Sequence, residues 1–493
     1  MIHDVVILGG GPAGSAAGRL LASWGRSVLI LARGGARDAM AESLPPSAAK
    51  LLDRVGMLGA VEQGGFVRSS GNSVRWESGD TRPEYFGEGA LGWQVRRDSF
   101  DAVLLASAAS VGAKVIPDAS AREVSDPDAD GVRDVLFEGV GRQTVQARWV
   151  LDCTGRSGLV ARRGWRSSES AARTLAIVGV WSCEAGWELR DASHTIVESY
   201  DAGWAWSIPV SAGQRYVTVM VDPAHTSIGS GPALTVTYLA ALGRTVAMRE
   251  LVATATLTGM PWARESSPYG FTRAGEQGVL LVGDAASFVD PLSSYGMKKA
   301  FASAWLAAVV THAALGDSAI VPHALELYQS REREMHDELQ RQAASLARDA
   351  AARHGSDFWS DRGRGAAGGG LQPGAWVHAT RAAFEDIRSR PRIALRCADS
   401  LAYIPRAMVT GNLLAVAPHL VTPAAPHPIR FVRNVDVVGL CEIADCFDQV
   451  PDLFHAYNRH AGTSCELPDF LAALATLVAI GALELLDSPP PGS

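Results

Sequence analysis

Cysteine and lysine are scarce in this chain of 493 residues. The six cysteines form no CxxC pair, which fits a reducing cytoplasm better than a disulfide framework. The four lysines are Lys50, Lys114, Lys298 and Lys299, so arginine carries nearly all of the positive charge. The net charge is −7 and no basic run stands out, which argues against nucleic acid as a partner.

Long hydrophobic runs are also missing. The longest one, residues 300–315, falls short of the roughly 20 residues that span a bilayer. Because Lys298, Lys299 and His312 lie beside or within it, we expect a buried helix and no membrane association. No basic stretch precedes an apolar one at the N-terminus, so no signal peptide is predicted and the expected location is cytoplasmic.

The N-terminal pattern predicts a β-α-β unit. Residues 3–8 and 27–31 are apolar and β-branched, as strands buried on both faces are. Between them, small residues over 12–24 predict a helix that ends at Gly25, since glycine takes positive φ without strain.

The rest of the chain continues this α/β pattern. Residues 174–221 contain several short strands with turn residues, typical of an antiparallel sheet. A buried strand over 279–282 precedes a long helix from about Tyr295, and residues 326–353 are helical and charged. The glycine-rich residues 363–373 are the best candidate for a linker between structural units.

Residues 9–14 read GGGPAG and form a GxGxxG turn between the first strand and the first helix. Gly9 makes the tight turn, Gly11 lets the backbone approach a pyrophosphate, and Gly14 lets the helix pack on the strand. Pro12 and Ala13 open the helix, whose N-terminus then faces the phosphates. The alternative is a glycine turn in a fold that binds no nucleotide.

The second strand departs from the usual dinucleotide pattern. Such strands commonly end in an acid that binds the ribose hydroxyls, but this one ends in Ala32 and Arg33. We place Arg33 among the candidate cofactor-binding residues, and we expect another residue or water to bind the ribose.

The strand at 279–282 runs into Gly283-Asp284, and a loop from Asp290 to Gly296 follows. Together with the glycine turn, this resembles the FAD monooxygenase superfamily built like para-hydroxybenzoate hydroxylase. The resemblance implies FAD as the cofactor, with Asp284 on its ribityl chain. The resemblance also implies that the loop leads into a helix that begins at the isoalloxazine ring. The residues placed there are Pro291, Ser294, Gly296 and Met297. The alternative for Asp284 is a helix N-cap.

Smaller segments fit the same resemblance. The family places an arginine near FAD in a segment similar to residues 93–101, where Arg97 matches best. It places a flavin-contacting segment where this chain has Glu42 and Ser43, and residues 152–158 resemble the stretch that closes over the adenosine. Arg97 could equally be a solvated surface arginine.

Residues 203–209 read GWAWSIP and resemble the WxWxIP motif of flavin-dependent halogenases. Their spacing puts Trp204 and Trp206 on one face of a strand, where the family uses them to wall off the flavin from the substrate chamber. The alternative is an aromatic pair in the core. The order of motifs over residues 1–345 resembles the halogenase and hydroxylase branch. Residues 42–47 and 290–300 look closest to flavoproteins that mature peptidyl tryptophan into quinone cofactors.

One halogenase feature is missing. Flavin halogenases guide hypohalous acid with a lysine amine, in a stretch that corresponds to residues 65–72 of this chain. No lysine occurs between Lys50 and Lys114. Arg68 is a poor substitute, because a guanidinium stays protonated. We therefore predict hydroxylation, with halogenation and a prenyl-saturating flavin reductase as alternatives.

The C-terminal region carries five scattered candidate metal ligands: Cys441, Cys446, His455, His460 and Cys465. Their spacing lacks the close pairs of known zinc modules, so no metal is predicted and packing or surface roles are favoured. Residues 435–485 read as three or four short helices after a break at 418–428. This region could clamp a peptide or carrier-protein substrate, or it could be a lid or a dimer contact.

The predicted fold is therefore α/β: a Rossmann-like FAD-binding domain interleaved with an antiparallel substrate sheet, plus a helical C-terminal extension. The predicted boundaries are residues 1–345 for the interleaved FAD-binding and substrate-sheet domain, 346–375 for the end of a helix and the glycine-rich linker, and 376–493 for the helical C-terminal domain. The predicted enzyme is an FAD-dependent monooxygenase that hydroxylates an indole, a phenol or a peptidyl tryptophan through a flavin C4a-hydroperoxide in a dry pocket. No second dinucleotide motif occurs, so NAD(P)H binds transiently or a separate flavin reductase supplies electrons.

Overall fold

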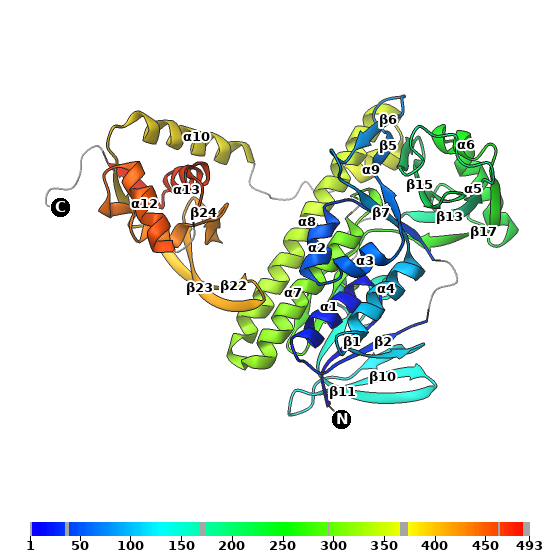
Figure 1. The fold of residues 1–493 in the computed structure, drawn as a ribbon, viewed down its shortest axis with the longest axis horizontal. Helices are drawn as coiled ribbons and strands as arrows, with labels where there is room; N and C mark the ends of the chain where they lie inside the picture. Colours follow the sequence, from blue (N-terminus) through cyan, green and yellow to red (C-terminus); the bar gives the residue numbers. More distant parts are fainter. Residues whose placement is uncertain are drawn as a thin grey trace. The chain divides into compact units, whose positions relative to one another are not determined.

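The computed structural model describes residues 2–34, 39–167, 173–293, 295–364, 373–461 and 464–486. The chain divides into two compact units, Met1–Ala367 and Gly368–Ser493 (Figure 1). Most of the predicted linker at 363–373 lies outside the described residues.

A mainly parallel sheet organises the first unit. Its strands run in the order β19-β20-β11-β1-β2-β8. In addition, β10 pairs with β11, and β9 pairs with β10. The central strand β1 is buried because it has parallel neighbours on both sides and helices over it. The strands are β1 Ile2–Leu8, β2 Val28–Ala32, β8 Lys114–Pro117, β9 Ser120–Val124, β10 Arg133–Gly139, β11 Gly141–Asp152, β19 Gly275–Glu276 and β20 Val279–Leu281.

Helices α1 (Pro12–Ser23), α4 (Arg97–Ala109) and α7 (Gly296–Gly316) pack beside one another against this sheet (Figure 1). The helix α8 (Val321–His354) packs along α7. The longest apolar run lies in α7, where most side chains are buried, so the predicted buried helix is confirmed. In the described parts of the chain, no helix has the length and apolarity needed to cross a bilayer.

A second sheet has seven strands in the order β17-β13-β16-β15-β14-β5-β6, and all of its pairs except β14–β5 are antiparallel. One face packs on α5 (Pro232–Gly243) and α6 (Ala247–Leu251), and the other contacts α8 and α9 (Asp357–Gly363). The strands are β5 Gly71–Arg75, β6 Arg82–Tyr85, β13 Leu175–Ser182, β14 Thr195–Tyr200, β15 Gly203–Ser211, β16 Gln214–Val221 and β17 Thr256–Glu265.

Short elements connect the two sheets. A three-stranded sheet joins β3 (Ala41–Leu44), β7 (Gly92–Arg96) and β4 (Val67–Ser69), and β12 (Arg166–Ser167) pairs with β18 (Gly270–Phe271). Helices α2 (Ala48–Arg54) and α3 (Leu58–Gln63) follow β3. The segments of the parallel and antiparallel sheets alternate along the chain, which confirms the predicted interleaved α/β fold.

The second unit is not simply helical, which corrects that part of the prediction. Its core contains helices α10 (Pro373–Ser389), α11 (Val437–Cys441), α12 (Val450–Ala461) and α13 (Leu467–Ala479). It also contains β21 Ala394–Cys397, β22 Ala402–Thr410, β23 Leu413–Thr422, β24 Ala425–Ile429, β25 Phe431–Val432, β26 Val435–Asp436 and β27 Leu483–Leu486. The predicted break at 418–428 is a hairpin, because β23 pairs with both β22 and β24.

Candidate active site

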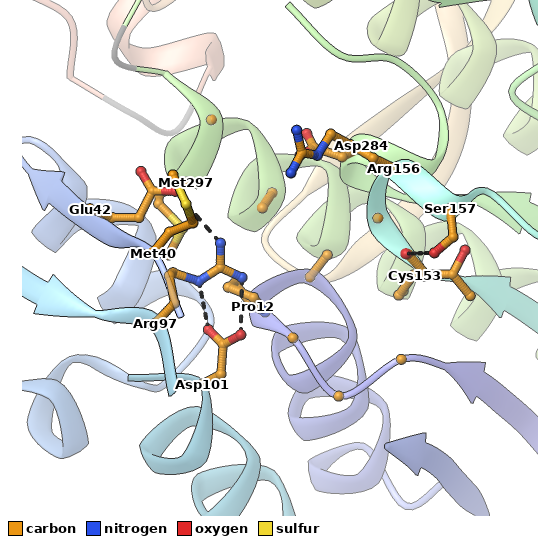
Figure 2. A pocket seen from close by; sticks show the side chains of 18 of the residues that line it. Pro12, Met40, Glu42, Arg97, Asp101, Cys153, Arg156, Ser157, Asp284 and Met297 are labelled. Carbon is orange, nitrogen blue, oxygen red and sulfur yellow. Dashed lines mark hydrogen bonds and ion pairs between the residues drawn. The ribbon is translucent and has the colours of Figure 1, made fainter. Parts of the chain in front are cut away.

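A cleft of about 1150 Å3 opens at the carboxyl ends of β1, β2, β11 and β20 in the first unit. Parallel α/β sheets characteristically bind ligands at this edge, where the loops after several strands meet. Figure 2 shows side chains from α1, the β3–β7 sheet, the loop after β11 and the start of α7 facing one another across it.

The glycine turn lines one end of the cleft, and the three glycines of its GxGxxG pattern have different surroundings. Gly9 has φ +113°, and a Cβ there would lie 2.4 Å from the carbonyl oxygen of Cys153. A Cβ on Gly14 would lie 1.9 Å from the carbonyl oxygen of Gly9. Gly11 has φ −77°, and a Cβ there would meet nothing closer than 3.7 Å. Packing therefore requires Gly9 and Gly14, whereas the protein leaves space beside the backbone of Gly11.

The loop after β11 forms the wall beside the glycine turn, against which Cys153 packs. Asp152 is fully buried and accepts hydrogen bonds from the backbone N–H of Thr154 at 3.1 Å and of Val160 at 2.7 Å. Burial raises the pKa of its carboxyl, and these hydrogen bonds oppose that shift. Asp152 thus shapes the loop, while Arg156 lies near Asp284 at the cleft (Figure 2).

Three charged side chains, Arg97, Asp101 and Glu42, lie together in the cleft. Arg97 binds Asp101 through Nε at 2.9 Å and Nη2 at 3.0 Å, and its Nη1 lies 3.6 Å from Glu42 Oε1 (Figure 2). Burial in the cleft raises the pKa of the Glu42 carboxyl; Arg97 opposes this, and Asp284 and Asp101 add to it. Burial works against the charge of Arg97, but Asp101 and Glu42 keep its pKa raised, so it stays a cation.

Asp284 lies in the turn that follows β20, and Lys299 on α7 holds this turn. The Lys299 amine is nearly fully buried and donates to Asp284 Oδ1 at 3.2 Å and to the carbonyl oxygen of Gly283 at 3.1 Å. It also donates to the carbonyl oxygen of Ser287. Three acceptors therefore occupy the three protons of this ammonium group.

The far part of the cleft is apolar. Trp204 and Trp206 stack with ring centroids 4.5 Å apart and both line it, as their spacing predicted. Trp76 packs edge-on against Trp204, and Trp359 packs edge-on against Trp76, so these rings support the wall. The neighbouring side chains are mostly apolar too: Val197, Ile208, Phe288, Val289, Pro291, Leu292 and Leu339. Flat apolar surfaces of this kind favour contact with an aromatic ring.

The structure brings nearly all of the sequence-predicted site residues to this one cleft. Those that line it are Gly9, Gly11, Pro12, Ala13, Arg33, Glu42, Ser43, Arg97, Trp204, Trp206, Asp284, Pro291, Gly296 and Met297. Gly14 does not line the cleft, because it packs against the turn. Ser294 lies outside the described residues.

Sequence reasoning missed Asp118. This residue follows β8, which pairs with β2 so that Pro117 is opposite Ala32, and it lines the cleft beside Arg33. It therefore offers a carboxylate at the strand edge where Ala32 supplies none. Only the pairing of two strands more than 80 residues apart brings it there, so a local motif could not reveal it.

The position of Asp118 leads to a test of adenosine binding. Asp118→Asn is expected to raise the Kd for FAD about tenfold, because a charge-assisted hydrogen bond contributes about 1.5–3 kcal/mol. Asparagine keeps the shape and tolerates the φ of +52° at this position. The measurement is a fluorescence titration with FAD, with Asp130→Asn in an exposed turn as the control. Equal affinities in the two variants would contradict this role.

The candidate ligands of the second unit have ordinary roles. Cys441 and Cys465 are buried free thiols, and Cys446 is an exposed one. His460 lies 3.5 Å from Glu442. Across the described ranges, no three histidine, cysteine or carboxylate side chains converge as a metal site would require.

The sequence of this chain is similar to that of known proteins. A family model described as tryptophan halogenase matches residues 72–384, well over half of the chain. The chain belongs to the tryptophan halogenase family. One relative in this family, a tryptophan 2-halogenase from Chondromyces crocatus, is 30% identical over 342 residues. The match covers 66% of this chain and 64%, less than two thirds, of that relative.

Solved structures of flavoproteins share the fold. The flavin-dependent halogenase CmlS superimposes with a TM-score of 0.76 at 19% identity, covering 99% of this chain and 98% of CmlS. The peptidyl tryptophan dihydroxylase QhpG superimposes with a TM-score of 0.70 at 22% identity, covering 94% and 97%. The predicted cofactor, FAD, agrees with the flavin-dependent proteins found in this comparison.

The residues present fit this cofactor. The space beside the Gly11 backbone, where the nearest protein atom would lie 3.7 Å from an added Cβ, suits a pyrophosphate at the N-terminus of α1. The N-terminus of α7, at Gly296 and Met297, faces the same cleft and favours negative charge there. The matching family is named for halogenation, so the comparison gives no support to the alternative of a prenyl-saturating flavin reductase.

Proposed function

We propose that this enzyme hydroxylates an electron-rich aromatic ring, an indole or a phenol, and does not transfer halogen. The observation that carries the proposal is that no lysine amine is available at the cleft. A halogenase needs such an amine to hydrogen-bond hypohalous acid or to form a haloamine. The WxWxIP motif and the names of the relatives favour halogenation, which is the second candidate.

None of the four lysines offers an unengaged amine to the cleft. Lys299 lines the cleft, but its three protons are donated to Asp284 and two carbonyl groups. Lys298 lies 3.5 Å above the ring of Tyr295, outside the cleft lining. Lys50 and Lys114 are exposed on α2 and β8, and neither lines the cleft.

The stretch that corresponds to the halogenase lysine segment offers no substitute. Arg68 is exposed on β4, donates to the carbonyl oxygen of Leu91 at 3.0 Å and lies 4.4 Å from the ring centroid of Trp93. Its neighbour Ser69 is buried and donates to the carbonyl oxygen of Gly71. Neither side chain is a nucleophilic amine, which supports oxygen transfer without a halogen carrier.

The tryptophans Trp204 and Trp206 are proposed to hold the ring and to keep water away from the reacting atoms. When reduced FAD is bound, it supplies the activation of oxygen, and the protein supplies binding, orientation and a dry wall. The chamber contains apolar side chains and stacked indoles, which suit an aromatic substrate better than a charged one.

The cofactor contacts are proposed by carrying the family roles onto the matching positions. Gly9, Gly11, Pro12 and Ala13 would hold the pyrophosphate, with Gly14 packing the turn and Arg33 at the adenosine end. Glu42, Ser43, Arg97 and Asp284 would contact the flavin half. The proposed neighbours of the ring system are Pro291, Ser294, Gly296 and Met297.

We propose a tryptophan within a peptide or carrier protein as one form of the substrate. QhpG is named a peptidyl tryptophan dihydroxylase, and another relative is a chlorinase of a pyrrole on a peptidyl-carrier protein. We propose that the second unit serves substrate recognition, because it has its own core and α9 completes the first unit without it. Electrons would come from NAD(P)H or from a separate flavin reductase.

The role of the second unit can be tested by truncation. A chain ending at Ala367 is expected to fold and to bind FAD as the full chain does, because the described residues that line the cleft all precede it. It should lose activity on peptide substrates more than on free indoles. The measurements are flavin content and product yield for both substrates, and loss of flavin from the truncated protein would contradict this division of roles.

The proposed function is tested by product mass. The enzyme is supplied with reduced FAD and oxygen together with free indoles, phenols or tryptophan peptides. The expected product is heavier by one or two oxygen atoms, and oxygen is consumed in proportion. Oxygen consumption that depends on no aromatic substrate, with no oxygenated product, would contradict hydroxylation.

A further inference from the structure

The apolar wall formed by β14 and β15 contains one hydroxyl group. The two strands contribute five of the described residues that line the cleft: Thr195, Val197, Trp204, Trp206 and Ile208. Val197 is opposite Trp206 in the strand pair, and side chains alternate along a strand, so Thr195 shares this face with Val197 and Trp206. Thr195 is buried, and its hydroxyl therefore has little contact with solvent.

Gln94 on β7 determines the direction of this hydroxyl. Gln94 is buried, and its Nε2 donates to the carbonyl oxygen of Ser193 at 3.1 Å and to Thr195 Oγ1 at 3.0 Å. A carbonyl oxygen can only accept, so the amide nitrogen has to face Ser193, and this fixes the orientation of Gln94. Thr195 Oγ1 accepts the other amide proton, and its own hydrogen points elsewhere. Within the described ranges, the Thr195 hydroxyl donates to no protein acceptor.

The chain just before this hydroxyl is held by further hydrogen bonds. Arg215 is fully buried and donates to the carbonyl oxygens of Ala192 at 2.9 Å and His194 at 2.6 Å. The Asp191 carboxylate accepts from the Ser70 hydroxyl at 2.7 Å. The strand that carries the hydroxyl is therefore fixed before any ligand arrives, and a ligand does not have to order it.

A fixed donor in an apolar chamber favours a ligand that has an acceptor at the matching point. A ligand that excludes water and offers no acceptor leaves the hydroxyl proton unpaired, which costs free energy. The oxygen of a phenol can accept this proton, whereas an indole nitrogen only donates. A plain indole would therefore leave the Thr195 proton without a partner.

We propose that Thr195 selects aromatic substrates that carry a hydroxyl group on the ring, by donating a hydrogen bond to the oxygen of that group. The inference rests on the proposed aromatic chamber and narrows its substrate class to a phenol or a hydroxyindole. Thr195 is assigned to binding and specificity, and no bond to it forms or breaks. Gln94 is a positioning residue, because it acts through Thr195.

The test uses the full-length protein with oxidised FAD bound. The ligands are phenol, toluene, which has a methyl group in place of the hydroxyl, and indole. The Kd of each is obtained from its effect on the visible absorbance of the bound flavin, and the Kd of FAD is measured for each protein. No turnover is needed.

Three variants are compared with the wild type. Thr195→Val removes the hydroxyl and keeps the branched shape, while Thr195→Ser retains the hydroxyl. Thr258→Val makes the first change at an exposed position on β17, outside the cleft lining, where the hydroxyl contacts Ser182 at 3.0 Å.

We expect Thr195→Val to raise the Kd for phenol about tenfold and to leave the Kd values for toluene, indole and FAD unchanged. The ratio of the toluene Kd to the phenol Kd should therefore fall about tenfold in this variant. Thr195→Ser and Thr258→Val should keep the wild-type ratio.

The proposal is overturned if Thr195→Val keeps the wild-type ratio, or if it weakens all three ligands alike, which would indicate a packing role. It is also overturned if the Kd of FAD rises while the ratio holds, because the hydroxyl would then serve the cofactor. Because binding is measured without turnover, absence of an oxygenated product would contradict hydroxylation and leave this result standing. An unchanged ratio in an enzyme that does oxygenate its substrate would contradict this inference alone.

Discussion

Gly11→Val is expected to raise the Kd for FAD by at least about a hundredfold while the protein still folds. The backbone at Gly11 has φ −77°, and the nearest atoms to a Cβ there are Asp101 Oδ2 at 3.7 Å and Arg97 Nη2 at 3.9 Å. The protein can therefore accept a side chain at this position, whereas a pyrophosphate against the backbone cannot. The measurements are the flavin content of the purified protein and its thermal unfolding.

Two kinds of control separate ligand loss from misfolding. Gly59→Val adds the same side chain in α3, where a Cβ would meet nothing within 4 Å, and should bind FAD normally. Gly9→Ala and Gly14→Ala should instead destabilise the fold, because each Cβ would overlap a backbone carbonyl. Normal FAD binding by Gly11→Val would remove the support for the glycine turn as the pyrophosphate site.

With reduced FAD, oxygen and excess chloride or bromide, we expect the aromatic product to gain oxygen and no halogen. Halogen transfer would need a lysine amine near the substrate, and the one lysine that lines the cleft, Lys299, is fully engaged by its acceptors. The measurement is mass spectrometry of the products, where the isotope pattern of chlorine or bromine is unmistakable.

A halogenase relative assayed alongside should give a halogenated product under the same conditions, which shows that the halide was usable. Trp206→Phe keeps an aromatic wall and serves to assign any product to this cleft. A halogenated product that the wild type makes and Trp206→Phe loses would overturn the hydroxylase proposal and favour the second candidate.

The strands of the second unit could not be predicted locally. Pro405 and Pro418 face each other across the β22–β23 pair, and β23 is the middle strand of its sheet. Proline cannot donate to a strand ladder, so its presence argues against a central strand. The sheet accommodates both prolines by placing them opposite each other, and this arrangement depends on pairing that no short segment encodes.

The sequence by itself determined the features that depend on neighbours along the chain. The glycine turn, the strand that ends at Asp284 and the alternation of Trp204 and Trp206 follow from backbone geometry over a few residues. The absence of lysine between Lys50 and Lys114 is likewise a property of the sequence alone. The glycine turn and the segment around Asp284, through their resemblance to the FAD monooxygenase superfamily, predicted the cofactor.

Tertiary structure alone decided which side chains share a surface. The pairing of β8 with β2 brings Asp118 beside Arg33. The helix α7 brings Lys299 to Asp284, where hydrogen bonds engage the lysine amine. A groove lined by five arginines, Arg156, Arg162, Arg166, Arg173 and Arg264, forms where the loop after β11 meets the chain after β17. Contacts between distant segments depend on the packing of whole sheets and helices, and periodicity over a few residues does not specify that packing.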